Sequence, residues 1–78
     1  MHLTRGELVM EVSYNRLWKL LIDKNMKKKD LRAKTGISWT SITKMTKNEP
    51  VSMSILSKIC NLLEVNIGEI MDFIPKKQ

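Results

Sequence analysis

Hydrophobic residues recur at helical spacing along most of the chain. Tyr14, Leu17 and Leu21 fall on one face of a helix, because they follow one another at intervals of three and four residues. Ile42 and Met45 repeat this spacing in the middle of the sequence. Strict alternation of apolar and polar residues, which is typical of half-buried strands, is scarce. The pattern predicts an all-α fold.

Polar and special residues between these stripes divide the chain into five predicted helices. We place them at about 13–25, 28–35, 39–46, 52–63 and 66–73. Residues whose side chains can accept hydrogen bonds from helical N–H groups stand at or just before four of the starts, namely Ser13, Ser38, Ser52 and Asn66. Gly36 and Pro75 end two of the helices. The helix at 52–63 is apolar on nearly all sides, so we expect it to be the buried centre.

The length and composition narrow the class of protein. A chain of 78 residues accommodates one domain, which we assign to residues 13–75. Residues 1–12 are either an arm that precedes the domain or in part a remnant foreign to the protein, and residues 76–78 form a basic tail.

Catalytic and metal chemistry have few candidate residues. The single cysteine, Cys60, allows no internal disulfide and no cysteine-based zinc site, and we expect it to be a small core residue. The single histidine, His2, lies close to the chain end. We therefore predict no enzyme, no cofactor and no metal. No apolar run approaches the roughly 20 residues that span a bilayer, and no signal-peptide pattern is present, so we expect a cytoplasmic protein.

The charges are strongly segregated. The net charge of +6 conceals ten lysines and arginines against two aspartates in residues 13–48, and one lysine against four acidic residues in 49–75. All excess positive charge thus belongs to one block that contains the first three predicted helices. A basic half joined to an acidic half is typical of a domain that binds a polyanion.

The second and third predicted helices form a helix-turn-helix candidate. Leu31 and Ile42 point inward from the two helices, and Gly36 stands at the turn, where the chain needs a positive φ. The second helix begins with Lys27, Lys28 and Lys29, although the positive end of the helix dipole disfavours cations. Such a cost indicates that this end holds an anion such as a phosphate.

Residues 14–74 resemble the small Cro/CI (Xre-type) family of helix-turn-helix regulators. The match is carried by MKKKDLRAKTGISWTSI at 26–42, VSMSILSKIC at 51–60 and IGEIM at 67–71. The chain is also similar to the short VanU-type regulators of vancomycin-resistance gene clusters. The resemblance implies a compact five-helix Cro/CI-like domain. Two positions depart from the family pattern: Arg32 replaces the usual small residue, and Lys27 often corresponds to Ser or Thr.

The resemblance also implies roles for individual residues. The side chains expected in the major groove are Trp39, Thr40, Thr43 and Lys44. The expected phosphate contacts are Lys27, Lys28, Ser41 and Lys47. The chemistry is suitable, because lysine donates to guanine, threonine bonds base edges or touches a thymine methyl, and tryptophan offers apolar contact. As an alternative, Trp39 packs over the second helix as a partly exposed residue.

These observations favour sequence-specific binding of double-stranded DNA by a bacterial transcriptional regulator. We expect a homodimer, formed either in solution or only on DNA, through the C-terminal apolar residues Ile67, Ile70, Met71, Phe73 and Ile74. The alternative is a protein-interaction module, an antitoxin or anti-repressor adaptor, whose basic face meets an acidic partner. RNA binding is less favoured, because the basic block lacks interleaved aromatic residues.

Overall fold

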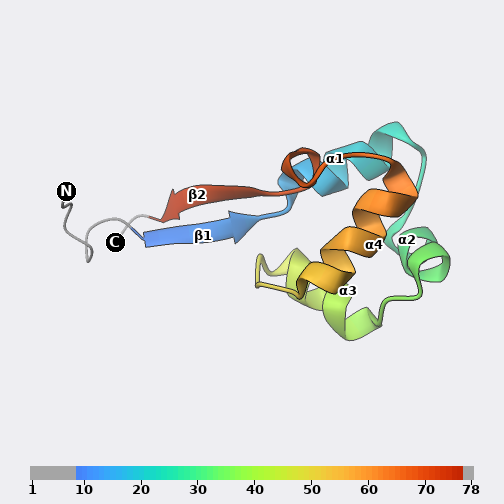
Figure 1. Ribbon diagram of the computed structural model, residues 1–78, viewed down its shortest axis with the longest axis horizontal. Helices are drawn as coiled ribbons and strands as arrows, with labels where there is room; N and C mark the ends of the chain where they lie inside the picture. Colours follow the sequence, from blue (N-terminus) through green and yellow to red (C-terminus); the bar gives the residue numbers. More distant parts are fainter. Residues whose placement is uncertain (1–8, 77–78) are drawn as a thin grey trace.

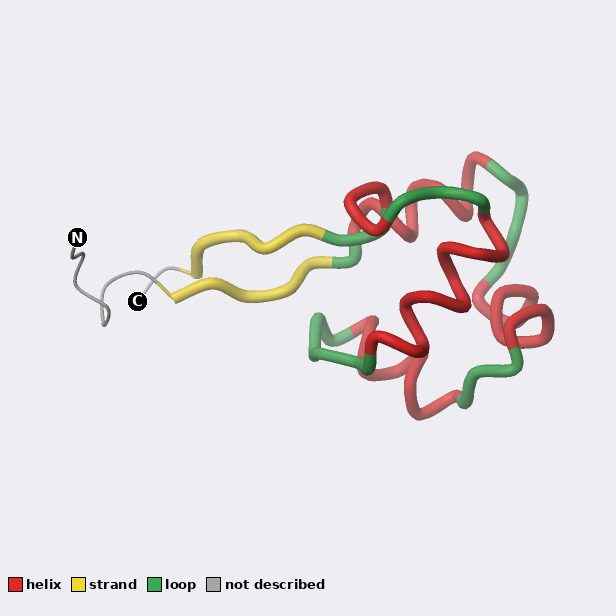
Figure 2. Tube along the Cα trace, in the orientation of Figure 1, coloured by secondary structure: helices red, strands yellow, loops and turns green. Residues whose placement is uncertain are grey.

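The computed structural model describes residues 9–76, which form four α-helices, one 3₁₀-helix and two strands. In chain order the elements are β1 (Val9–Ser13), α1 (Asn15–Asp23), α2 (Lys28–Thr35), α3 (Trp39–Thr46), α4 (Met53–Leu63), η2 (Ile67–Glu69) and β2 (Asp72–Lys76). The helices make one body, and the two strands form a ribbon that projects from it (Figures 1 and 2). The molecule accordingly measures 43 × 22 × 19 Å.

A single core joins the helices. Its buried hydrophobic residues come from every α-helix and from the segments between them, and they are Tyr14, Leu17, Leu21, Leu31, Ile37, Ile42, Met45, Leu56, Ile59, Leu63 and Ile70. Helix α4 lies in the middle of this body (Figure 1) and contacts both α2 and η2. Its first residue, Met53, is nevertheless 70% exposed, so only part of α4 is central.

The predicted bounds of the second and third helices are confirmed. Helices α2 and α3 span 28–35 and 39–46, and Gly36 between them has φ 77°, in the left-handed region. Ser38 caps α3 by accepting a hydrogen bond from the Ser41 backbone N–H at 3.2 Å. Ser52 caps α4 in the same way through the Ile55 N–H. Local signals therefore determine the bounds of α2 and α3 and the start of α4.

The prediction of a fifth helix at 66–73 is wrong. Asn66 does precede a helical turn, and its N–H donates to the Glu69 carboxylate, but the turn is only the three residues of η2. The chain then extends into β2, which carries Phe73 and Pro75. The fold is mostly helical rather than all-α, because pairing with a distant strand outweighs the local helical spacing.

Strand β1 explains the shorter first helix. The strands pair antiparallel, with Val9 opposite Lys76, Met10 opposite Pro75 and Ser13 opposite Asp72. Ser13 is therefore drawn into the ribbon, and α1 begins at Asn15 rather than directly after Ser13. The Asn15 N–H still donates to Ser13 Oγ at 3.4 Å. The rest of the predicted arm, residues 1–8, and the tail residues 77–78 lie outside the described residues.

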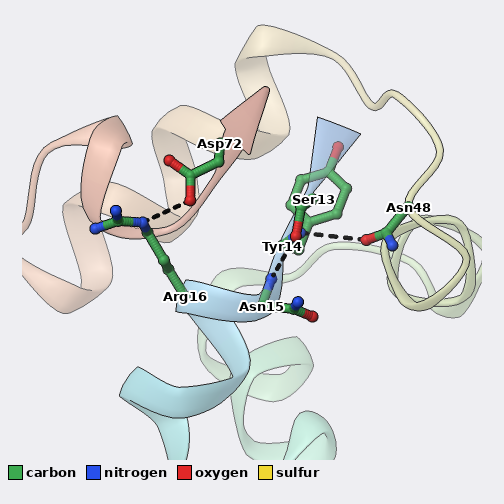
Figure 3. Close-up of polar contacts among 6 residues, drawn as sticks. All are labelled: Ser13, Tyr14, Asn15, Arg16, Asn48 and Asp72. Carbon is green, nitrogen blue, oxygen red and sulfur yellow. Dashed lines mark hydrogen bonds and ion pairs between the residues drawn. The ribbon is translucent and has the colours of Figure 1, made fainter. Parts of the chain in front are cut away.

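The root of the ribbon is attached to the loop that follows α3. Tyr14 is fully buried, and its hydroxyl donates to the Glu49 carbonyl oxygen at 2.9 Å. Its backbone N–H donates to Asn48 Oδ1 at 3.2 Å, and Arg16 Nε bonds Asp72 Oδ2 at 2.6 Å (Figure 3). The ribbon and the end of α3 are thereby held in a defined relation.

Replacement of Tyr14 by phenylalanine tests this attachment. Tyr14→Phe keeps the ring in the core and removes the hydroxyl that the Glu49 carbonyl accepts. We expect the free energy of unfolding at neutral pH to fall by about 1–2 kcal/mol, because a partly buried carbonyl loses its donor. Urea unfolding followed by circular dichroism measures the difference. An unchanged unfolding midpoint would show that the hydrogen bond contributes nothing.

Alkaline titration provides an independent check. Burial raises the pKa of Tyr14 above its ordinary value of 10.0, and hydrogen bonding to the Val51 backbone partly opposes this. A raised pKa in the folded state means that the stabilisation is complete below about pH 10 and is lost as the pH rises through the folded value. The wild type should therefore lose more stability than Tyr14→Phe as the pH rises above about 10. A constant difference between the two proteins would contradict the buried placement.

Candidate nucleic-acid interface

Helix α3 separates its side chains into a buried and an exposed face. Ile42 and Met45 are 2% and 0% exposed, and they fix the helix on the core. The four residues predicted to face the major groove, Trp39, Thr40, Thr43 and Lys44, are all exposed. The inward orientation of Ile42 and Met45 is thus confirmed, and the opposite face of α3 is open to a ligand.

The exposed face of α3 borders a shallow hollow of about 410 Å³. Its lining residues are Trp39, Thr40, Thr43, Lys44, Lys47 and Glu49. The four predicted groove residues therefore lie together, with the predicted phosphate contact Lys47 beside them. Hydroxyls and ammonium groups on one such surface can donate to base edges and to phosphates.

Sequence reasoning missed the contribution of Glu49 to this hollow. The chain turns back after α3, and the Glu49 N–H donates to the Lys44 carbonyl oxygen at 2.9 Å. The residue before it, Asn48, has φ 58°, which makes the reversal possible. No motif marks an acidic residue that reaches a basic surface through such a turn. A carboxylate here can accept from cytosine N4 and disfavours nearby phosphate.

Arg32 is the second residue that sequence reasoning did not place on this surface. Its side chain is exposed, and its guanidinium carbon lies 5.3 Å from the centroid of the Trp39 ring. The long side chain thus leaves the crossing of α2 and α3, where the family usually has a small residue. Trp39 contacts α2 through this stacking, yet 49% of its surface stays exposed. The pair presents a cation held against an aromatic face beside the start of α3.

The start of α2 carries the remaining basic candidates. Lys27 and Lys28 are exposed. The Lys27 side chain cannot accept a hydrogen bond, and instead its backbone N–H donates to Asp30 Oδ2 at 2.9 Å. Lys28 Nζ lies 4.6 Å from the centroid of the Trp18 ring. A cation–π contact therefore offsets part of the dipole cost that the lysine run implies.

The other predicted residues occupy varied environments. The Ser41 hydroxyl is 3.2 Å from Ser38 Oγ, inside the cap of α3. Of the residues predicted for the dimer interface, Ile70 is fully buried in the core of the chain and cannot contribute to a surface. Ile67, Phe73 and Ile74 are 40%, 66% and 38% exposed, and Met71 is partly buried.

The structure offers no metal centre among residues 9–76, since no three histidine, cysteine or acidic side chains gather there.

Cys60 packs against the core, and burial, aided by the Glu69 charge, raises the pKa of its thiol. The thiol is therefore protonated at neutral pH. Within residues 9–76, no helix has the length and apolar character that crossing a membrane requires.

Two short helices joined by a left-handed glycine, with the second presenting a polar and basic face, define a helix-turn-helix domain of the DNA-binding class. The chain belongs to the Cro/C1-type HTH DNA-binding domain family, which matches it over residues 16–76. It is similar to the crystal structure of the transcriptional regulator VanUg, with 43% sequence identity and a TM-score of 0.85. That comparison covers 97% of this chain and 99% of the other. Among curated proteins, no significant match is found.

The stacking of Arg32 on Trp39 is open to a direct test. Arg32→Met keeps the aliphatic stem and removes the cation, so we expect the free energy of unfolding to fall by about 0.5–1 kcal/mol, as for an exposed cation–π pair. Lys34→Met, also on the exposed surface of α2, is the matched control and should change stability by less. Chemical denaturation of both variants measures the difference. Equal effects would show that the stacking is energetically negligible.

Proposed function

We propose that the protein is a bacterial transcriptional regulator that binds a specific duplex DNA sequence with α3 in the major groove. The observation that carries this proposal is the hollow along α3, where all four predicted base-reading side chains lie on one exposed face. Membership of a DNA-binding family and the similarity to VanUg, a transcriptional regulator, support it. The proposed activity requires no catalytic group or cofactor, and its setting is the cytoplasm.

Each side chain of the surface has a separate task in this proposal. Lys44 donates to guanine, Thr40 and Thr43 contact base edges or thymine methyl groups, and Trp39 adds apolar contact. Arg32, held against the Trp39 ring, supplies a second donor next to α3. Phosphates on either side are held by Lys27, Lys28, Ser41 and Lys47.

In this proposal the protein acts as a homodimer. One such domain makes few base contacts, and two-fold readers place their recognition helices in successive turns of the major groove, about 34 Å apart. The basic surface of one subunit repels that of another, so association uses the C-terminal region instead. The exposed or partly exposed residues that serve this contact are Ile67, Met71 and Phe73.

Selection of bound fragments from random duplex DNA, followed by titration, tests the function. With the selected site in hand, Lys44→Ala should weaken binding to it by about 1–3 kcal/mol and affect an unrelated duplex much less. The core residues of α3 are untouched, so the fold is retained. Equal weakening on both duplexes would show that Lys44 does not read bases.

Lys28→Ala is the contrasting variant, because it removes a predicted phosphate contact. Binding should weaken about equally on every sequence, and the slope of log K against log salt should flatten by roughly one unit. Its stability should change little, since the lost contact with Trp18 and the relieved dipole repulsion oppose each other. If wild-type protein shows no sequence preference at fixed salt, the adaptor function replaces the proposal.

A further inference from the structure

The ribbon formed by β1 and β2 has one apolar and one largely polar face. Side chains alternate along each strand, and directly opposite residues share a face. Met10 lies opposite Pro75 and Val12 opposite Phe73, so these four apolar residues form one face. The other face carries Glu11, Ser13, Asp72 and Ile74. Met10 is 49% and Phe73 66% exposed, which leaves much of the apolar face in contact with water.

An apolar groove of about 530 Å³ continues this face at the root of the ribbon. Val12 and Phe73 line it from the ribbon, Met53 and Leu56 from α4, and Ile67 from η2. Asp72 is the one charged residue among those that line it, and Arg16 holds its carboxylate in an ion pair. The apolar face and the groove therefore form one continuous surface, on different elements of the same chain.

By themselves, two five-residue strands form only a marginally stable ribbon in water. Their apolar face requires a cover. We infer that this cover is a second copy of the chain: two ribbons lie antiparallel, apolar face to apolar face, and the tip of each enters the groove of the other. This inference rests on the homodimer proposed above and names its surface.

The extent of the surface favours a second copy. A face of four side chains covers at most a few hundred Å², below the roughly 800 Å² per subunit of a standard interface. Packing the ribbons face to face adds both grooves, since Met10 and Pro75 at one tip reach Met53 and Ile67 of the other copy. Each subunit then supplies both the inserted side chains and the groove, as a two-fold contact requires.

The distribution of charge favours the same arrangement. The basic residues of α2 and α3 lie outside this surface, and the acidic residues outnumber the basic ones in 49–75. Two copies that meet through the ribbons thus keep like-charged surfaces out of the contact and leave both α3 faces free. An acidic protein partner, by contrast, would find no complementary cation in the groove.

Adjacent residues of β2 provide a matched pair of variants. Phe73→Lys places a charge in the apolar face, whereas Ile74→Lys places the same charge on the other face, opposite Glu11. Sedimentation equilibrium of the full chain should show a dimer dissociation constant raised about tenfold or more by Phe73→Lys and little changed by Ile74→Lys. Circular dichroism confirms that both variants are folded. Equal effects of the two variants overturn the inference.

Mixing two further variants tests the antiparallel arrangement. Met10→Lys and Met53→Glu should each weaken self-association, and the second is compatible with folding because an acidic residue suits the start of α4. The mixture should associate more tightly than either variant alone, since the introduced ammonium of one chain faces the introduced carboxylate of the other. Failure of the mixture to associate overturns the proposed contact between tip and groove.

Titration of the same variants with the selected duplex separates this inference from the proposed function. If Phe73→Lys still prefers a half-site of the selected duplex over unrelated DNA but loses cooperative binding to the full site, the proposed function and the ribbon contact both stand. If wild-type protein discriminates yet stays monomeric in solution and on DNA, or if Phe73→Lys dimerises normally, the ribbon surface is wrong and DNA reading is retained. If wild-type protein dimerises through the ribbon but shows no sequence preference, the proposed function falls alone.

Discussion

The burial of Tyr14 connects the two halves of this molecule. Its ring lies in the core that the helices share, its hydroxyl bonds the chain reversal that follows α3, and its backbone bonds Asn48 in the same reversal. One residue thus belongs to the end of the ribbon, the start of α1 and the neighbourhood of the recognition helix. A domain this small has few buried residues to distribute, so one side chain with both an apolar ring and a polar end serves three elements.

Local signals made the DNA-binding half of the fold predictable. Gly36 and Ser38 act within a few residues of themselves, and the helices they separate begin and end where the sequence indicates. The prediction of a fifth helix was wrong because non-local pairing decides the conformation there. Ile67, Ile70 and Met71 have helical spacing, but the conformation after Ile70 is decided by a strand at the other end of the sequence. Residues 66–73 do not contain the strand that decides this conformation.

The candidate site shows the same division. Position within α3 was enough to predict that Trp39, Thr40, Thr43 and Lys44 share an exposed face. The approach of Arg32 to Trp39, of Lys28 to Trp18 and of Glu49 to the hollow depends on how separate segments meet. The lysine run at the start of α2 illustrates the difference. Its cost is visible in the sequence, but the aromatic ring that offsets part of it lies on another helix.

The order in which the elements are synthesised gives the ribbon a further consequence. All four α-helices lie within residues 15–63, whereas β1 can pair only after β2 has been synthesised, and the Arg16–Asp72 ion pair joins residues 56 positions apart. Contacts of such long separation form late in folding. A nascent chain that contains α4 but not β2 can therefore form the helices without the ribbon. Only a chain translated through β2 can complete the strand pair. A formed ribbon therefore requires that synthesis has passed β2.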